Sequence, residues 1–271
     1  MARGVVVPFG SYFEHFQNAT VVVPERLRPA EVAQDGEALP EFAARVYDEF
    51  FGKLVPSSPG EKVLTEWIRP RLEIIGHSIE SAAMSDALKA SIRERLDAEG
   101  LLLADDKSQT VGCFVRSDTN VEDQDNFNGA GLNLTIFNLK SLDDIYSGIK
   151  QVWASPFTYR SFSWRQSLID EPLWVLPSVV ILESIPSEKS GVLVTADIDS
   201  GDQTKMLIAT SEGVGGAVDG TPAETLLWSE EGVELVTQFK SHYRRLLKAE
   251  GGSEVVPATG SDYVLSDDEV A

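Results

Sequence analysis

The chain contains little sulfur and no long apolar run. Cys113 is the one cysteine among 271 residues, so no internal disulfide can form, and no Cys/His cluster has the spacing of a zinc site. No run of about eighteen apolar residues occurs, which argues against a membrane-spanning helix. The opening residues Met1-Ala2-Arg3-Gly4 lack the apolar core of a secretory signal. We therefore expect a cytoplasmic protein with no membrane partner.

Positive charge is also scarce. Lys and Arg number 23 against 43 Asp and Glu, which gives a formal net charge of −20. Binding to nucleic acid or to an anionic membrane needs a basic surface that releases counterions. The composition therefore argues against both kinds of partner.

The most informative segment runs from Val115 to Asp123 and continues to Asn133. In it, Arg116 leaves a β-run where a polar loop begins. A guanidinium offers a planar fork of donors to phosphate oxygens, and hydroxyls and loop amides can add further donors. The spacing is not that of the Lys-bearing phosphate loop. From the residues alone, a surface ion pair beside a turn remains the alternative.

The segment from Phe114 to Leu139 resembles a region of a known family. It is similar to the phosphate-contacting region in the nucleotide-binding domain of phosphoenolpyruvate synthases and pyruvate phosphate dikinases, where a Val-Arg-Ser-Ser string leads into an Ala-Glu-Asp loop and a glycine-containing turn. Further motifs follow in the order of that family: Val152–Phe157 with Arg160, Pro177–Glu183, Ser190–Thr195 with Asp199-Ser200-Gly201, and Glu212–Gly215. The resemblance covers residues 110–228, and more loosely Gly4–Gly10.

The resemblance implies an α+β fold of the ATP-grasp type, with two α/β subdomains that clasp ATP and a helical segment near the N-terminus. We expect residues 1–110 to hold a strand and a helical subdomain, and 111–175 to hold the phosphate-loop strand and helices. Residues 176–271 then form a β-rich subdomain. The Ser266-Asp-Asp-Glu269 sequence begins a helix that has no body, so we expect a fragment truncated at its C-terminus.

Apolar periodicity supports this order of elements. We expect a strand at Val5–Val7, then a turn and an aromatic patch at residues 8–16. Three helices follow, from Pro40, from Glu61 with an interruption at Pro70, and at Ser85–Ala98. A helix from Ser141 is interrupted at Pro156. Short runs predict a mixed or antiparallel sheet at Ser178–Leu182, Gly191–Ala196, Lys205–Thr210, Ala223–Trp228 and Val233–Phe239, followed by a polar loop at Gly251–Gly260.

The resemblance also implies a binding site for ATP and Mg²⁺. It assigns Arg116 to the phosphates as the catalytic residue, with further phosphate contacts from Ser117, Thr119, Gly129 and Gly131. It places the adenine near Glu183 and Ile185, and adds Thr195, Glu212 and Gly213 to the nucleotide site. Glu122, Asp123 and Asp199 are the expected metal ligands. For each carboxylate taken singly, a solvated strand end is the alternative.

Two functions remain open. In the first, the chain is the ATP-binding domain of a dikinase-like phosphotransferase and positions ATP phosphates for transfer to a histidine on another domain. His15, His77 and His242 lack the surroundings of that carrier histidine, so phosphohistidine and substrate domains are expected elsewhere. In the second, the chain is a non-catalytic nucleotide-binding or scaffold domain with an incomplete metal site. The sequence has neither a Gly-Lys-Ala opening nor a Gln-x-Arg-Pro string, so it does not tell whether the chain binds or turns over ATP by itself. The phosphoryl acceptor is not readable from the sequence either.

Overall fold

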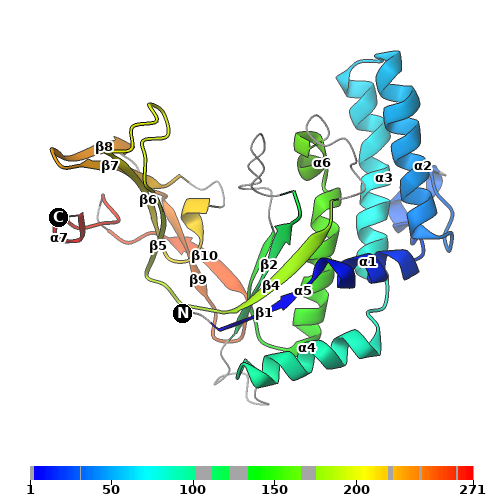
Figure 1. Ribbon diagram of the computed structural model, residues 1–271, viewed down its shortest axis with the longest axis horizontal. Helices are drawn as coiled ribbons and strands as arrows, with labels where there is room; N and C mark the ends of the chain where they lie inside the picture. The colour runs from blue at the N-terminus through cyan, green and yellow to red at the C-terminus, as the bar shows by residue number, and fades with distance from the viewer. Residues whose placement is uncertain are drawn as a thin grey trace. The chain divides into compact units, whose positions relative to one another are not determined.

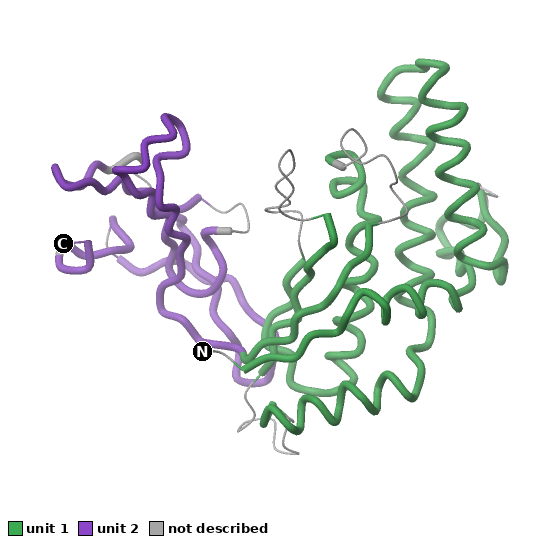
Figure 2. The backbone as a smooth tube through the Cα atoms, viewed as in Figure 1, with its two compact units in different colours: residues 1–183 green, residues 184–271 purple. Residues whose placement is uncertain are grey.

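The computed structural model describes residues 3–30, 32–101, 112–121, 134–165, 175–218, 222–237, 240–260 and 262–270. They form two compact units, Met1–Glu183 and Ser184–Ala271, shown in different colours in Figure 2. The first unit combines helices with an antiparallel sheet, and the second consists mainly of antiparallel sheets. In the part of the chain that the structure describes, no helix is both long enough and apolar enough to cross a membrane.

A four-stranded antiparallel sheet organises the first unit. Its strands are β1 (Gly4–Val7), β4 (Pro177–Glu183), β2 (Cys113–Thr119) and β3 (Thr135–Leu139), in the spatial order β1-β4-β2-β3 (Figure 1). Along the chain β4 directly precedes the strands of the second unit, and we expected it to share their sheet. It pairs with β1 and β2 instead, which closes the first unit around a strand that comes late in the sequence.

Helices cover one face of this sheet. The helices are α1 (Phe9–Asn18), α2 (Leu39–Glu49) with a π-helical extension (Phe50–Leu54), α3 (Glu61–Ser81), α4 (Asp86–Ala98), α5 (Leu142–Ala154) and α6 (Tyr159–Arg165). α5 packs on β2 and β4, α1 on β4, and α4 on β1. The helix-facing residues Cys113, Val115, Val179 and Ile181 are fully buried, and they belong to one apolar core shared with the helices.

Local signals explain most helix boundaries. The Ser141 hydroxyl accepts a hydrogen bond from the Asp144 amide at 3.0 Å and so caps α5. Ser85 caps α4 in the same way through the Leu88 amide. Phe42, Val46 and Phe50 are buried, which confirms the predicted apolar stripe of α2 and its extension.

Two predictions for the helices were wrong. The residues expected as a turn and an aromatic patch form α1, in which Tyr12 and Phe16 are one turn apart and buried. Pro8 stands at the N-cap of α1, a position where its missing N–H costs nothing. α3 is also continuous through Pro70. The proline removes the hydrogen bond to the carbonyl of Glu66, and the exposed position of Glu66 allows that loss.

The second unit is built from two antiparallel sheets. The larger has the order β5-β6-β7-β8, and the smaller is the hairpin of β9 and β10. Their bounds are Lys189–Val194 (β5), Met206–Glu212 (β6), Glu224–Ser229 (β7), Gly232–Thr237 (β8), Tyr243–Leu247 (β9) and Ser253–Pro257 (β10), and the short helix α7 spans Asp267–Val270. The first four strands were predicted. The prediction of a polar loop at Gly251–Gly260 was wrong. Strand β10 lies there and pairs with β9, a strand that the sequence did not predict.

Candidate functional site: an arginine on an open sheet face

Arg116 projects from the sheet face that the helices do not cover. In the register of the sheet, Arg116 lies opposite Val180 on β4 and Thr135 on β3, and directly opposed residues point to the same face. Its side chain is exposed, and it forms no hydrogen bond or ion pair with another residue that the structure describes. Within the described part of the chain, the guanidinium is therefore free to contact a ligand.

Apolar side chains neighbour Arg116 on this open face, and the hydrogen-bonded pair of Asp118 and Ser178 lies two residues further along the strands. Val6 of β1 lies opposite Val180 of β4 and is 61% exposed. Phe114 and Phe137 meet edge to face, with ring centroids 5.6 Å apart. Apolar side chains beside a guanidinium that has no partner among the described residues suit a ligand with an aromatic part and an anionic part.

Ser117 points to the opposite face and is bonded within the protein. Its hydroxyl accepts the amide hydrogen of Leu134 at 2.9 Å, and its own amide donates to the Leu134 carbonyl at 3.0 Å. Thr119 is half-buried at the end of β2, opposite Pro177. Of the three phosphate-contacting side chains expected on β2, only that of Arg116 is fully open to solvent.

A groove of about 800 Å³ lies between α3 and the segment from Gln151 to Ser161, and it reaches Leu134. Arg26, Arg69 and Arg160 line it together with Glu73 and Glu80, so positive charge is in slight excess there although the chain is acidic. Arg26 pairs with Glu73 at 2.5 Å, whereas the guanidinium of Arg69 stacks 4.2 Å from the ring centre of Tyr159. Among the described residues, neither Arg69 nor Arg160 has a carboxylate partner. Since Leu134 adjoins Thr135, the groove begins next to the strand position that faces Arg116.

The carboxylate of Glu183 is held by Arg3. Arg3 Nε donates to Oε2 at 3.0 Å and Nη2 to Oε1 at 2.9 Å, while Nη1 donates to the Gly100 carbonyl at 3.0 Å. The hydrogen bond from Arg3 lowers the pKa of Glu183. Glu183 lies opposite Cys113, on the helix-covered face. The buried Cys113 thiol has its pKa raised to about 11 by desolvation, so it is not a thiolate.

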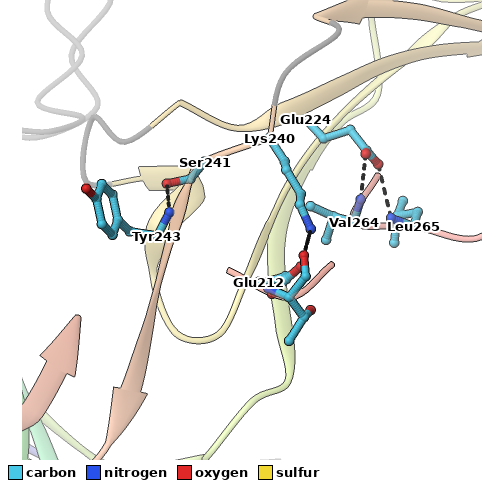
Figure 3. Close-up of polar contacts among 8 residues, drawn as sticks. Glu212, Glu224, Lys240, Ser241, Tyr243, Val264 and Leu265 are labelled. Carbon is cyan, nitrogen blue, oxygen red and sulfur yellow. Dashed lines mark hydrogen bonds and ion pairs between the residues drawn. The ribbon is translucent and has the colours of Figure 1, made fainter. Parts of the chain in front are cut away.

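Glu212 in the second unit takes part in an internal ion pair. Lys240 Nζ donates to its Oε1 at 2.5 Å (Figure 3). The Thr259 amide donates to its Oε2 at 2.8 Å. Burial raises the pKa of Glu212, but the hydrogen bonds from Lys240 and Thr259 outweigh burial and lower it to about 2. The carboxylate is charged, and both of its oxygens are already bonded.

The glycine-rich turn after Glu212 is also bonded internally. The Gly213 amide donates to the Glu188 carbonyl at 2.6 Å, and the Val214 amide donates to the Arg245 carbonyl at 2.9 Å. The Gly215 amide donates to the Ser190 hydroxyl at 3.0 Å. Gly213 and Gly215 both have a φ of +78°, a conformation that favours glycine. The three successive amides thus fix the turn to its own unit.

Thr195 and Asp199 lie at the other end of the β5–β6 hairpin. Both are exposed, and the Asp199 amide donates to Asp197 Oδ1 at 3.1 Å. Lys189 faces Glu212 while Val194 faces Leu207, so the length of β5, about 17 Å, separates the two groups. Ile185 is 52% exposed. The other expected residues, Glu122, Asp123, Gly129 and Gly131, lie outside the described residues.

No metal centre can be built from the residues that the structure describes. They contain no group of three or more His, Cys, Asp or Glu side chains placed to hold an ion. The arginine groove was absent from the predicted site. Arg160 carried part of the family resemblance, but Arg69 and Tyr159 come from helices far apart in the sequence, and no local pattern brings them together.

The chain belongs to the family of pyruvate phosphate dikinase AMP/ATP-binding domains, whose family model matches residues 47–271. This confirms the resemblance drawn from the sequence, and it makes the chain an ATP-binding domain of the dikinase type.

Individual relatives agree with this assignment. The probable phosphoenolpyruvate synthase of Methanothermobacter thermautotrophicus is 28% identical over 167 residues, which cover 59% of this chain and 24% of that protein. The phosphoenolpyruvate synthase of Aeropyrum pernix is 28% identical over 148 residues, which cover 55% of this chain and 18% of that protein. The uncharacterized phosphotransferase YvkC of Bacillus subtilis is 26% identical over 148 residues, which cover 55% of this chain and 17% of that protein. The chain spans a quarter or less of the length of these relatives.

Proposed function

We propose that the open face around Arg116 binds ATP, in an ATP-grasp domain that serves a phosphoenolpyruvate synthase-like or pyruvate phosphate dikinase-like phosphotransferase. One observation carries the proposal: a guanidinium without a partner among the described residues stands on a sheet face that the described helices leave open, beside apolar side chains. The apolar side chains suit the base and the ribose, and the guanidinium suits the phosphates.

The groove supports the same assignment. ATP is strongly anionic and the chain carries a net charge of −20, so its phosphates need a locally positive surface. Arg69 and Arg160 provide one in the groove that begins at Leu134. Arg116 would contact one part of the phosphate chain, while Arg160 would face its far end or the group that receives the phosphoryl.

The contribution of this chain to transfer is binding and orientation. Its own residues form no covalent intermediate in this proposal, since phosphoryl transfer depends mainly on positioning and charge neutralisation. The acceptor histidine would belong to another domain of a longer protein, and the substrate domain likewise. His15 fits this view, because it is buried, bonded to the Ile79 carbonyl, and has its pKa lowered by desolvation.

The roles of the remaining expected residues are narrower. Ser117, Glu183, Glu212 and Gly213 use their polar groups within the protein, so we propose that they support the scaffold. Thr119, Ile185 and Thr195 remain proposed nucleotide contacts. Magnesium, when bound with ATP, would neutralise phosphate charge. Its coordination by Glu122, Asp123 and Asp199 remains a proposal, because the described residues form no metal cluster.

The second candidate is a non-catalytic nucleotide-binding or scaffold domain with an incomplete metal site. The internal bonding of Glu212 and of the three amides that follow it favours this candidate, since those groups have no free donor or acceptor for a triphosphate.

Calorimetry of ATP binding, with and without magnesium, tests the proposal. We expect the unsubstituted chain to bind ATP and Arg116→Ala to bind at least about tenfold more weakly, because a hydrogen bond to a charged group contributes about 1.5–3 kcal/mol. Arg95→Ala, an exposed arginine on α4, is the matched control and keeps the affinity. Absence of heat at millimolar ATP supports the scaffold, and equal binding by both variants contradicts the role of Arg116.

A further inference from the structure

Polar side chains at the end of β2 extend the hydrogen-bond ladders on both of its sides. Ser117 bonds to Leu134, the residue that precedes β3, and Asn120 bonds to Leu176, the residue that precedes β4. Each pair makes two hydrogen bonds. The side-chain oxygen of Ser117 or Asn120 accepts the amide of its leucine partner, and the carbonyl of that leucine accepts the amide of Ser117 or Asn120.

The Ser117–Leu134 pair links β2, the strand that carries Arg116, to a residue of the groove wall. Ser117 Oγ accepts from the Leu134 amide at 2.9 Å, and the Ser117 amide donates to the Leu134 carbonyl at 3.0 Å. Leu134 lines the arginine groove, and the next residue, Thr135, lies opposite Arg116. This pair therefore determines where the groove wall stands relative to the strand that carries Arg116.

The Asn120–Leu176 pair continues the β2–β4 ladder by one hydrogen-bonded pair. The missing N–H of Pro177 costs this ladder nothing, because only alternate residue pairs of an antiparallel ladder exchange hydrogen bonds and Thr119 and Pro177 form the pair between them. Asn120 Oδ1 accepts the Leu176 amide at 2.7 Å, and the Asn120 amide donates to the Leu176 carbonyl at 3.2 Å. Two residues before Asn120, the Asp118 carboxylate on β2 accepts a hydrogen bond from the Ser178 hydroxyl on β4 at 2.9 Å. The end of β2 is thus fixed on both sides.

We propose that Ser117 and Asn120 are positioning residues for nucleotide binding, which act through Leu134 and Leu176 and not by touching the ligand. The inference rests on the proposed function. It departs from the expected role of Ser117 as a phosphate contact, because its hydroxyl lies on the helix-covered face and is bonded to backbone. Fixing these two backbone positions before ATP arrives reduces the ordering that binding must supply.

The test compares ATP dissociation constants with thermal midpoints measured without nucleotide. We expect Ser117→Ala and Asn120→Ala each to weaken ATP binding about fivefold or more, the effect of losing one well-formed hydrogen bond. Ser117→Thr keeps the hydroxyl and restores most of the affinity. Ser141→Ala is the matched control, since it removes the same kind of amide-to-hydroxyl bond at the start of α5. It lowers the thermal midpoint and leaves the dissociation constant unchanged.

Equal dissociation constants for the Ser117, Asn120 and Ser141 variants would overturn the inference. Hydrogen exchange of the nucleotide-free protein gives an independent readout: the Leu134 amide should exchange faster in Ser117→Ala, and the Leu176 amide in Asn120→Ala. Unchanged exchange overturns the inference as well. If the unsubstituted chain fails to bind ATP, the proposed function fails, while the exchange measurement still decides whether the two pairs fix the backbone.

Discussion

Arg116 and Glu183 project from opposite faces of the same sheet. Arg116 lies opposite Val180 and shares its face, whereas Glu183 stands three residues further along β4, opposite Cys113 and facing the helices. Side chains alternate along a strand, so an odd separation places the two on different sides. A ligand held by Arg116 on the open face therefore meets Val180 and Leu182 before it could reach the Glu183 carboxylate.

Replacing this carboxylate should affect the fold more than the ligand. Glu183→Gln removes the charge that binds two nitrogens of Arg3, so we expect a lower thermal midpoint with unchanged ATP affinity. Differential scanning fluorimetry and calorimetry measure the two quantities, with Glu94→Gln on the exposed side of α4 as the control. A change in preference between ATP and GTP at constant stability would instead show that Glu183 contacts the base.

The groove arginines should contribute to nucleotide affinity. Arg160→Ala is expected to weaken ATP binding about tenfold, because one charge-assisted contact to phosphate is lost. Arg69→Ala should act in the same direction and should also loosen Tyr159, on whose ring the guanidinium stacks. Calorimetry alongside Arg95→Ala checks this. An Arg160 variant that binds like the control would place the phosphates away from the groove.

Stability should fall in acid through Glu212. The pKa of this carboxyl is about 2 in the fold against an ordinary value of 4.5. The depressed pKa stabilises the folded state above about pH 4.5, and this contribution is lost as the pH falls towards 2. Urea unfolding at neutral pH and at about pH 3 should show a smaller acid-induced loss for Glu212→Gln than for the unsubstituted chain.

Lys240 provides the complementary experiment. Lys240→Met leaves the Glu212 carboxylate buried without its cation, so we expect a loss of about 3 kcal/mol at neutral pH, at the low end for breaking a buried pair. An unchanged unfolding free energy would mean that water replaces the ammonium.

Gly213 and Gly201 form a matched pair of substitutions. Their φ angles are +78° and +74°, so alanine at either position costs about 1 kcal/mol from the backbone. A Cβ at Gly213 would also overlap the carbonyl oxygen of Arg245, whereas no atom lies within 4 Å of one at Gly201. Gly213→Ala should therefore lower the thermal midpoint clearly more than Gly201→Ala. Equal losses would show that β9 can move away from the turn.

The sequence predicted the elements whose signals are local. The stripe of Phe42, Val46 and Phe50 has the helical period, and the Val-rich runs of the second unit have strand length, so burial pattern and element agree. The α1 helix was missed because its aromatic residues were read as a patch after the Pro8 turn, although Tyr12 and Phe16 have helical spacing.

What could not be predicted depends on distant partners. β4 finds β1 and β2 across more than fifty residues of chain, and only that pairing reveals which face each side chain occupies. The family resemblance is confirmed, and Arg116 stands where a ligand could reach it. The assignment of individual residues to ATP remains a prediction, because partners such as Arg3 and Lys240 can engage a carboxylate that the motif alone leaves free.

Glu224 binds the segment around Val264 and Leu265 to strand β7. Its carboxylate is 2% exposed and accepts the amides of Val264 and Leu265 at 2.6 and 3.1 Å, and the Val264 side chain is buried (Figure 3). A version of this chain cut after Leu265 should therefore keep the second unit folded. A version cut before Val264 would leave the buried carboxylate without these two donors, so we expect the second unit to lose its fold.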